Sequence, residues 1–424
     1  MLVQFSIKNF KTFKNKATLS FVASNYDKDT RVSENISVDE QFNLRILKSA
    51  VVYGANASGK SKLLEALDFM KYFVLNSSRE SQKGDQIKVT PFRLNEETEN
   101  EPSEFEVIFT NNNVLYRYGF EVNRDVIVSE WLYYRPKTKE IELFIRDLQD
   151  FFPHKKEFHK GKTLVKEELV RDNALMLSVA AQFNDPICNE VVKWFNELNV
   201  IAGNYEFSLR DKAIQKIKSE KGKEMMLSFL QWADLGIKDL EIRKITPQNL
   251  MDMKSNPFDV VITHHDKYRG VEKIGKVDFY LNLDESEGTQ KYFYILSPII
   301  DALVNGSILV IDELDAKLHP NLVEKLVSLF NSKSFNTNDA QLIFNTQDTN
   351  LLSSGLFRRD QILFTEKNKF GEARLFSLAD FKSDAVRKNE LFEDNYVRGK
   401  YGAVPYLNFF EELTDKLSQY ENEK

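Results

Sequence analysis

An early glycine-rich segment, GANASGKS at residues 54–61, has the composition and spacing of a phosphate-binding loop. It fits the pattern G-x-x-x-x-G-K-S/T, in which glycines permit a tight turn and consecutive backbone N–H groups point at a polyphosphate. Lys60 is expected to reach the β- and γ-phosphates, and Ser61 offers a hydroxyl to Mg²⁺. We therefore predict a site for ATP and Mg²⁺ formed by Gly54, Ala55, Asn56, Ala57, Ser58, Gly59, Lys60, Ser61 and Lys62.

Two adjacent carboxylates follow an apolar run at residues 307–311. Such a run predicts a buried parallel strand, which delivers the residues after it to the carboxyl edge of a sheet. Asp312 is expected to hold Mg²⁺ through water. Glu313, one residue further, is expected to orient or deprotonate the water that attacks the γ-phosphate. Alone this pair is a weak signal, but beside a phosphate-binding loop it predicts the catalytic acid pair.

A third segment, residues 283–291, ends a strand and begins a helix about two dozen residues before Asp312. Ser286 is placed to cap the helix, and the small Gly288 leaves backbone N–H groups accessible to a phosphate. The alternative interpretation is an ordinary capped core helix. We predict that Ser286 and Gly288 bind nucleotide.

The elements around these residues are those of an α/β protein. Residues 48–53 read as a buried strand, and residues 60–76 have the apolar spacing of a helix, so strand, loop and helix come in the required order. Strands are expected at residues 2–7 and 18–23, and the polar stretch 24–45 is expected to be loop. Strand–helix–strand alternation returns between residues 277 and 344, which suits a second half of the same sheet.

Between these halves the periodicity changes twice. Alternating segments between residues 104 and 145 predict an antiparallel meander, and residues 151–236 have helical grouping. We therefore expect an N-terminal lobe with an antiparallel arm at residues 1–148, a mainly helical insertion at 149–270, and a C-terminal lobe at 271–424. The predicted fold class is α/β, with a mostly parallel core sheet, an antiparallel β subdomain and a helical insertion.

The overall composition excludes several classes of protein. The 424 residues include 42% hydrophobic residues, enough for a large core, and one cysteine, which excludes an internal disulfide framework. Cys188 is expected to be buried. No segment approaches about 20 apolar residues, so no membrane contact is expected and a cytoplasmic location is predicted. The net charge of −6 argues against broad attraction to nucleic acid.

Several motifs resemble those of the ABC-class ATPases with a split head, the group of Rad50, RecF and the overcoming-lysogenisation-defect proteins. Within this group the chain resembles the bacterial RloA/AbiL-like phage-defence ATPases. The motifs lie at residues 9–13, 91–94, 285–291, 348–352 and 396–405. The resemblance implies an ABC-type ATPase head, in which Ser286 caps the γ-phosphate of ATP held by Lys60 of another copy.

The resemblance also assigns roles to single residues. Gln347 stands where related proteins carry a histidine that senses the γ-phosphate, and glutamine donates a hydrogen bond without carrying charge, so slow hydrolysis is expected. His319 departs from the family pattern and is expected to be an exposed residue at a helix start. Two further pairs of residues are assigned to base, phosphate or partner contacts, with packing or a solvated tail as the alternative: Lys11 with Phe13, and Arg398 with Lys400.

The expected function is an ATP-binding and hydrolysing switch that assembles at least as a homodimer and controls a separately encoded effector, such as a nuclease or toxin, in antiviral defence. The alternative is an ATPase that binds DNA ends in repair, for which basic stretches at residues 154–162 and 210–223 are the candidate contacts. A nuclease within the chain is not expected, because only a short segment follows the last ATPase motif. A metal site at His264 and His265 is not expected either.

Overall fold

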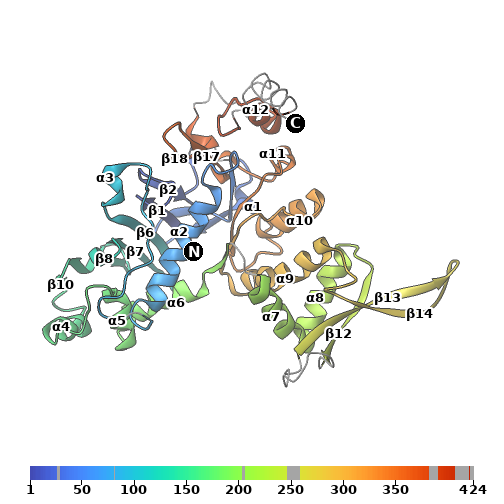
Figure 1. The fold of residues 1–424 in the computed structure, drawn as a ribbon, viewed down its shortest axis with the longest axis horizontal. Coiled ribbons are helices and arrows are strands. Elements are labelled where there is room, and N and C mark those ends of the chain that lie inside the picture. The colour runs from blue at the N-terminus through green and yellow to red at the C-terminus, as the bar shows by residue number, and fades with distance from the viewer. Residues whose placement is uncertain are drawn as a thin grey trace.

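The computed structural model describes residues 1–25, 29–80, 82–202, 206–245, 258–381, 390–405 and 420. The chain forms a layered α/β fold in which a mostly parallel sheet and an antiparallel sheet enclose helix α2 (Lys60–Asn76). A second group of helices covers the other face of the parallel sheet, and a long β-ribbon extends from that side (Figure 1).

The core sheet contains the strand that precedes the glycine-rich loop. Its order is β11 (Asn199–Ile201), β15 (Ile308–Ile311), β16 (Gln341–Asn345), β5 (Ser49–Tyr53), β17 (Ile362–Lys367) and β18 (Ala373–Ser377). All neighbouring pairs are parallel except β17 with β18. Strand β5 therefore lies between two strands that come about 290 and 310 residues later in the chain. The prediction of a mostly parallel core sheet is confirmed.

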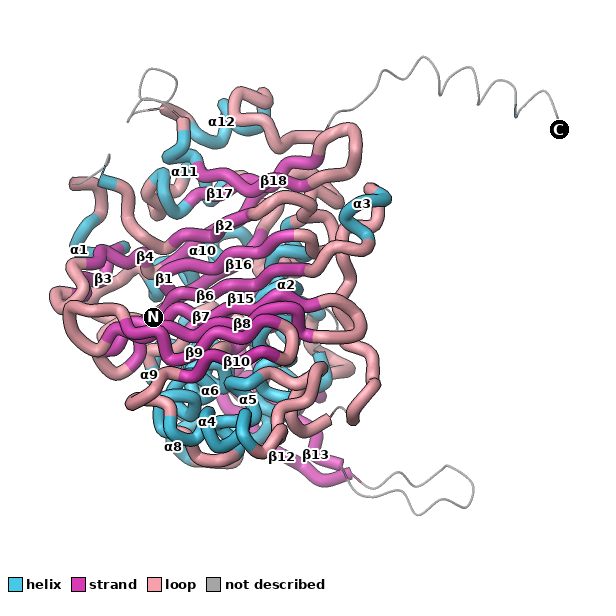
Figure 2. Tube along the Cα trace, turned by 90° about the vertical axis from the view of Figure 1, so that its left-hand side faces the viewer, coloured by secondary structure: helices cyan, strands magenta, loops and turns pink. Residues whose placement is uncertain are grey.

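The antiparallel sheet contains the predicted meander together with the N-terminal strands. Its order is β10 (Asp150–Pro153), β9 (Ile141–Asp147), β8 (Ile127–Arg135), β7 (Val114–Val122), β6 (Ser103–Asn111), β1 (Leu2–Lys8) and β2 (Ala17–Ser20). Figure 2 shows these strands running side by side. Strand β1 pairs with β6, so the first residues of the chain complete the sheet of the arm.

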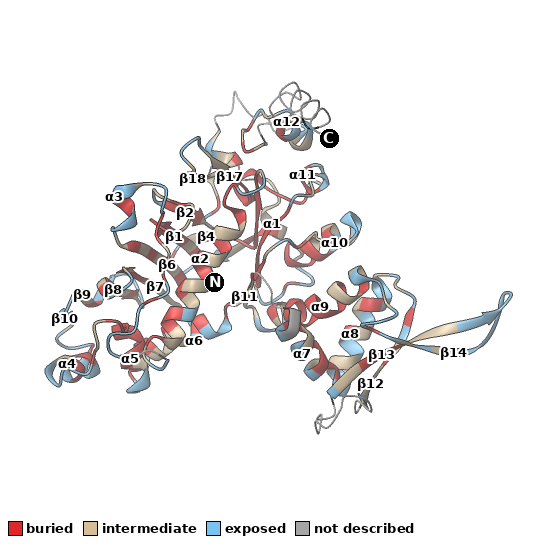
Figure 3. Ribbon diagram, viewed as in Figure 1, coloured by how far each residue is buried: buried red, intermediate tan, exposed pale blue. Residues whose placement is uncertain are grey.

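The alternation of side chains along β5 explains how the layers are joined. Ala50 and Val52 pack on the side of α2 and the antiparallel sheet, whereas Val51 and Tyr53 pack on the opposite side. That opposite side is covered by α9 (Glu287–Asn305) and α10 (Pro320–Phe330). All of β5 is buried (Figure 3), and burying a valine stabilises the fold by about 1.5–3 kcal/mol. The loop after β5 thus starts from a fixed position.

A buried ion pair ties the antiparallel sheet to helix α5 (Met176–Gln182). Glu130 and Arg146 are both fully buried, and their charged atoms lie 3.8 Å apart. Glu130 also accepts the N–H groups of Met176 and Leu177 at 2.7 and 3.0 Å, so it caps α5. Burial raises the pKa of Glu130, an effect that the neighbouring Arg146 opposes.

The segment of the chain between β10 and α9 begins with helices and continues with three strands. Its helices are α4 (His159–Lys166), α5, α6 (Pro186–Glu197), α7 (Glu206–Ile217) and α8 (Glu220–Trp232). A three-stranded sheet follows, with β12 (Ile237–Ile245), β13 (Phe258–Arg269) and β14 (Glu272–Tyr280) in sequence order. The shorter helices and strands are α1 (Val32–Asn35), β3 (Ile36–Asp39), β4 (Leu44–Leu47), α3 (Glu96–Glu99), α11 (Asn350–Ser353) and α12 (Phe392–Val397).

Two local expectations differ from the structure. The stretch 24–45 was expected to be loop, but outside residues 26–28, which are not described, it contains α1, β3 and the first residues of β4, and β3 pairs with β4. His264 and His265 were expected to lie in a loop at a strand end, but they lie inside β13, which continues to Arg269 as one side of a hairpin. No core covers this part of the hairpin, so its alternation of polar and apolar residues is weak.

In the described part of the chain, no helix has the length and apolar content needed to cross a bilayer.

Candidate functional site

The glycine-rich loop leaves the carboxyl end of β5 in a conformation that requires glycine. Gly54 has φ 153°, and a Cβ atom there would lie 2.4 Å from the carbonyl oxygen of Thr365. Gly59 has φ 121° and is packed against Thr12 and Phe13. The Ser58 hydroxyl lies 2.7 Å from that of Thr365, which joins the loop to β17. The loop is therefore held by its neighbours in one shape.

Lys60 folds back over the loop that precedes it. Its ammonium group donates to the carbonyl oxygens of Gly54 and Ala55, at 2.6 and 3.1 Å. Burial lowers the pKa of Lys60, and the nearby carboxylates of Glu313 and Asp312 oppose this effect. An ammonium group held this close to the loop suits a phosphate, which would replace the two carbonyl oxygens as its partner.

Three polar side chains from separate elements meet at the start of α2. The Ser61 hydroxyl donates to Asp312 Oδ1 at 3.0 Å, and the side-chain amide of Asn345 donates to the same oxygen. Ser61 starts α2, Asp312 follows β15 and Asn345 ends β16. Hydroxyl and carboxylate oxygens are hard ligands of the kind that Mg²⁺ prefers, so Ser61 and Asp312 fit the metal predicted for them.

Glu313 is held through its backbone while its carboxylate is exposed to solvent. Its φ is 52°, a left-handed conformation that is uncommon for glutamate. The N–H of Glu313 donates to Asn345 Oδ1 at 2.6 Å, and its carbonyl oxygen accepts from Lys291 of α9 at 2.7 Å. The exposed carboxylate lies close enough to Lys60 for its charge to oppose the effect of burial on the pKa of Lys60.

Gln347 reaches the glycine-rich loop from the end of β16. Its side-chain amide donates to Asn56 Oδ1 at 2.7 Å, and its backbone N–H donates to Asp315 at 3.2 Å. The structure thus brings Gln347 together with the loop, beside Lys60, Ser61, Asp312 and Glu313. Sequence reasoning missed Asn345, although an asparagine at the end of a buried apolar strand is a signal of a polar role.

Ser286 and Gly288 lie elsewhere in the same chain. The Ser286 hydroxyl caps α9 by accepting the N–H of Thr289 at 3.1 Å, and a Cβ atom on Gly288 would lie 2.5 Å from the carbonyl oxygen of Lys317. Both line a cavity of about 480 Å³ together with Lys317 and His319. No residue of the glycine-rich loop is among the described residues that line it. The cavity at Ser286 is therefore separate from the glycine-rich loop of the same chain, and a nucleotide role for Ser286 and Gly288 stays a prediction.

His319 has the position expected of a helix-start residue. It is exposed, and its Nδ1 atom accepts the N–H of Asn321 at 3.2 Å, so the histidine caps α10.

His264 and His265 pair with carboxylates, at 2.8 Å to Asp278 and 2.7 Å to Glu285. Within the described ranges, no group of three or more metal-ligating side chains is present. Burial raises the pKa of the Cys188 thiol well above its usual value, as suits a packed cysteine.

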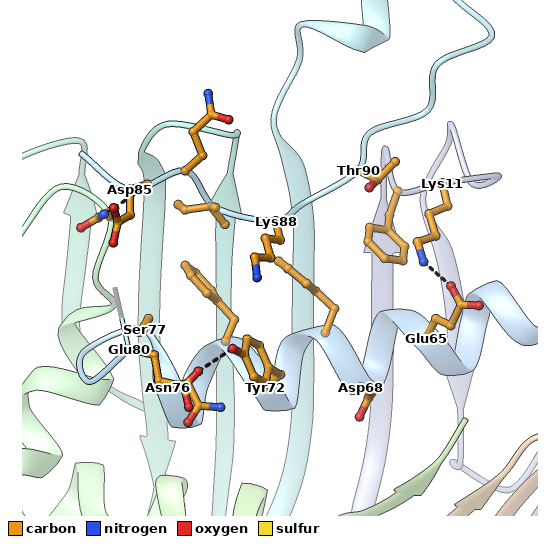
Figure 4. A pocket seen from close by; sticks show the side chains of 16 residues that line it. Lys11, Glu65, Asp68, Tyr72, Asn76, Ser77, Glu80, Asp85, Lys88 and Thr90 are labelled. Carbon is orange, nitrogen blue, oxygen red and sulfur yellow. Dashed lines mark hydrogen bonds and ion pairs between the residues drawn. The ribbon is translucent and has the colours of Figure 1, made fainter. Parts of the chain in front are cut away.

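Lys11 and Phe13 lie on the other side of the loop. Phe13 is buried beneath Gly59, and Lys11 forms an ion pair with Glu65 of α2. Figure 4 shows this pair at one end of a groove of about 590 Å³ along α2, with a hydrogen bond between Tyr72 and Glu80 at the other end. Packing accounts for Phe13, and the ion pair accounts for Lys11. Contacts of either residue with a nucleotide stay a prediction.

The C-terminal segment packs on the end of β5. The ring of Tyr396 lies 5.6 Å from that of Tyr53 and 5.3 Å from that of Phe364. Lys400 forms an ion pair with Glu390 at 2.7 Å, whereas Arg398 is exposed. This support of the glycine-rich loop by α12 was not expected from the sequence, because aromatic spacing in a polar tail does not indicate its partner.

Comparisons with known proteins bear on the whole arrangement. No curated protein matches the chain. Among solved structures, the chain is similar to the SMC head domain from Thermotoga maritima, at 13% identity over 89% of this chain and 98% of that chain, with a TM-score of 0.39. It is also similar to an SmcHead bound to the C-winged helix domain of ScpA, at 14% identity over 89% and 97% of the two chains, with a TM-score of 0.38.

A family model described as "AAA domain, putative AbiEii toxin, Type IV TA system" matches residues 49–353. The match begins at the first residue of β5 and ends in α11. It therefore includes the glycine-rich loop, the acid pair after β15 and the end of β16. Since the match covers well over half of the sequence, the chain belongs to this AAA-domain family.

Proposed function

We propose that the protein binds Mg²⁺-ATP at the loop of residues 54–61 and hydrolyses it slowly, as a switch. The observation that carries the proposal is the meeting of Ser61, Asp312, Asn345 and Glu313 beside Lys60, since these residues come from three separate segments of the chain. A surface loop before an ordinary helix has no need for such a network.

The chemistry follows from the positions of these side chains. Lys60 and the loop N–H groups bind the phosphates, and Ser61 with Asp312 holds Mg²⁺, which when bound neutralises charge on the β- and γ-phosphates. Glu313 orients a water molecule and accepts its proton as it attacks the γ-phosphate. Gln347 donates a hydrogen bond at the γ-phosphate, but it cannot supply the positive charge that a histidine would supply, so turnover is slow.

Assembly of two copies completes the site in this proposal. Ser286 and Gly288 lie at the exposed N-terminal end of α9, where backbone N–H groups and the helix dipole favour an anion. The cavity they line contains the cations Lys317 and Lys325 and excludes the loop of the same chain. A γ-phosphate bound to the loop of one copy would therefore be capped by the Ser286 turn of another.

The role of the switch is proposed from the family. Its description names a putative AbiEii toxin and a type IV toxin–antitoxin system. We infer that the ATP-bound assembly controls a separately encoded effector, a toxin or nuclease, in antiviral defence, as the RloA/AbiL-like resemblance also implies. DNA repair remains the second candidate function, because the ribbon described below is rich in exposed cations.

One variant tests the switch directly. Glu313→Gln keeps the shape of the side chain but removes its basicity, so the variant should bind ATP, hydrolyse it at least tenfold more slowly and accumulate as a dimer or larger assembly. Glu168→Gln is the matched control, because Glu168 is also an exposed glutamate with a positive φ, of 51°, and has no proposed chemical role. Hydrolysis at the parental rate by Glu313→Gln would show that another residue is the base.

A further inference from the structure

A two-stranded ribbon extends beyond the body of the molecule on the side of α8 (Figure 1). It is the outer part of the β13–β14 hairpin, residues 266–276, which we call the ribbon arm. The pairing of β13 with β12 stops at His265, whereas its pairing with β14 continues to the turn at Gly270. The ribbon arm is therefore a ladder of two strands with both faces in solvent.

The ribbon arm is rich in cations although the whole chain is acidic. It carries Lys267, Arg269, Lys273 and Lys276 but only two carboxylates, and one of these, Asp266, pairs with Lys273 at 2.7 Å. The other three cations are exposed and make no ion pair with any described residue. The chain as a whole has a net charge of −6, whereas the ribbon arm has more cations than carboxylates.

Of the two basic stretches expected from the sequence, residues 154–162 keep exposed lysines, whereas residues 210–223 have most of their lysines in ion pairs. In the helical region, Lys218 pairs with Asp259 at 2.7 Å, and Lys223 pairs with Asp239 at 2.8 Å. Lys216 is likewise bound to Asp301 of α9. These ion pairs hold the β12–β14 sheet and α9 against α7 and α8, so Lys216, Lys218 and Lys223 have structural partners, whereas Lys212 and Lys221 are exposed.

The end of the ribbon arm is apolar. Val271 is fully exposed, and the side chains of Tyr268 and Ile274 are 56% and 44% exposed. A partner that covers these apolar side chains removes their surface from water, which stabilises the complex by about 25 cal/mol for each Å² buried. An apolar tip on a cationic ribbon matches a partner with charged groups along its edges and apolar groups, such as thymine methyl groups, between them.

We propose that the ribbon arm binds duplex DNA. A two-stranded antiparallel ribbon fits the major groove of B-form DNA, where Lys267, Arg269 and Lys276 would contact phosphates and the apolar tip would contact base edges. The deep, narrow major groove of A-form RNA does not admit such a ribbon. This inference is independent of ATP hydrolysis, and it adds a binding site outside the nucleotide site.

The base of the ribbon arm is joined to the turn that we propose caps ATP. Thr263 Oγ1 donates to Glu285 Oε1 at 2.5 Å, and His265 Nε2 lies 2.7 Å from the same oxygen. Glu285 directly precedes Ser286. DNA bound on the ribbon arm would therefore act on the Ser286 turn through one carboxylate, and this coupling, unlike the binding itself, rests on the proposed function.

The test is fluorescence anisotropy of a labelled duplex of about three helical turns with the full chain, between about 50 and 200 mM salt. The triple variant Lys267→Gln, Arg269→Gln, Lys276→Gln should bind DNA at least tenfold more weakly. Its log K against log salt slope should be smaller by about 2.7, at about 0.9 per lost phosphate contact. The matched control is Lys155→Gln, Lys156→Gln, Lys160→Gln, which removes three exposed lysines elsewhere and should change neither quantity.

Each other outcome overturns the proposal. No binding by the unaltered chain at the lowest salt, or equal losses in both triple variants, would exclude a DNA site on the ribbon arm. Equal affinity for an RNA duplex would exclude the major-groove mode, and a changed oligomeric state without DNA would assign the ribbon arm to protein contacts. Lys60→Ala separates the two proposals, because it should lose ATP and keep DNA in the absence of nucleotide.

Discussion

Asn345 holds both catalytic candidates through one side-chain amide: its nitrogen donates to the carboxylate of Asp312, and its oxygen accepts the backbone N–H of Glu313. The residue ends β16 and is fully buried. A neighbouring strand of the core sheet therefore fixes the distance and orientation of the acid pair that follows β15.

Replacing this amide should lower the rate of hydrolysis without preventing nucleotide binding. Residues that orient metal-binding and catalytic groups typically account for 10- to 100-fold in activity, so Asn345→Ala should reduce kcat by roughly that factor. Steady-state ATPase assays and equilibrium binding of ATP measure the two effects. Asn336→Ala is the control, because Asn336 is equally buried but bonds only to loop backbone. An unchanged kcat in Asn345→Ala would show that the acids are positioned by other contacts.

Lys60→Ala should abolish measurable ATP binding. Hydrogen bonds to a charged group contribute about 1.5–3 kcal/mol each, so loss of the ammonium group weakens binding by at least tenfold. Titration calorimetry with ATP measures the loss. Lys216→Ala is the matched control, because Lys216 is a partly buried lysine that pairs with Asp301 of α9 and is not among the residues predicted to bind nucleotide. If Lys60→Ala binds ATP like the parent, the loop has no nucleotide role.

Gly54→Ala should disrupt the loop, because the added Cβ would lie 2.4 Å from the carbonyl oxygen of Thr365. Either β17 or the loop must move, and we expect a loss of stability of about 1–3 kcal/mol together with a loss of ATP affinity. Gly84→Ala also places alanine at a positive φ, but nothing lies within 4 Å of the new atom. Chemical denaturation and ATP titration of both variants separate crowding from backbone strain, and equal behaviour of the two would contradict the role of close packing.

Gln347→His should raise the rate of hydrolysis several-fold. An imidazole near Asn56 still donates a hydrogen bond, and near its ordinary pKa of about 6.5 it also carries positive charge for the γ-phosphate. The gain should be larger at pH 6 than at pH 8, since the fraction of charged imidazole falls as pH rises. A pH profile of kcat for both proteins measures it. A gain that is equal at all pH values would rule out charge as the cause.

Glu130→Ala should be among the most destabilising single substitutions in the antiparallel arm. Removing one partner of a buried ion pair typically costs 3–5 kcal/mol, and here the change also removes the cap of α5. Glu130→Gln keeps an acceptor for Met176 N–H and should cost less. Urea denaturation measures both, and a loss below about 1 kcal/mol for the alanine variant would mean that water or Tyr118 replaces the carboxylate.

Much of the core was predictable because its elements have strong local signals. The glycine pattern before Lys60, the apolar run before Asp312 and the alternating strands of the meander each indicate their own structure, and the structure places the first two beside each other. The positions of Gln347 and Ser61 followed from their order relative to those motifs.

The remainder depends on contacts between distant segments. Nothing local in β13 predicts that the strand continues beyond His265, because its solvent-exposed faces impose no alternation. The double role of Asn345 depends on the register of β16 against β15, and the support of Tyr53 by Tyr396 joins positions more than 340 residues apart. A single sequence does not specify such pairings.

Because β5 lies between β16 and β17, the centre of the core sheet can form only late in the synthesis of the chain. During synthesis, the strand that carries the glycine-rich loop has neither of its neighbours until β16 and β17 emerge, and both lie in the last quarter of the sequence. For most of its synthesis, the nascent chain therefore exposes a strand that is fully buried in the finished protein. The proposed nucleotide site, which includes the ends of β15 and β16, is therefore complete only after these late strands have been made.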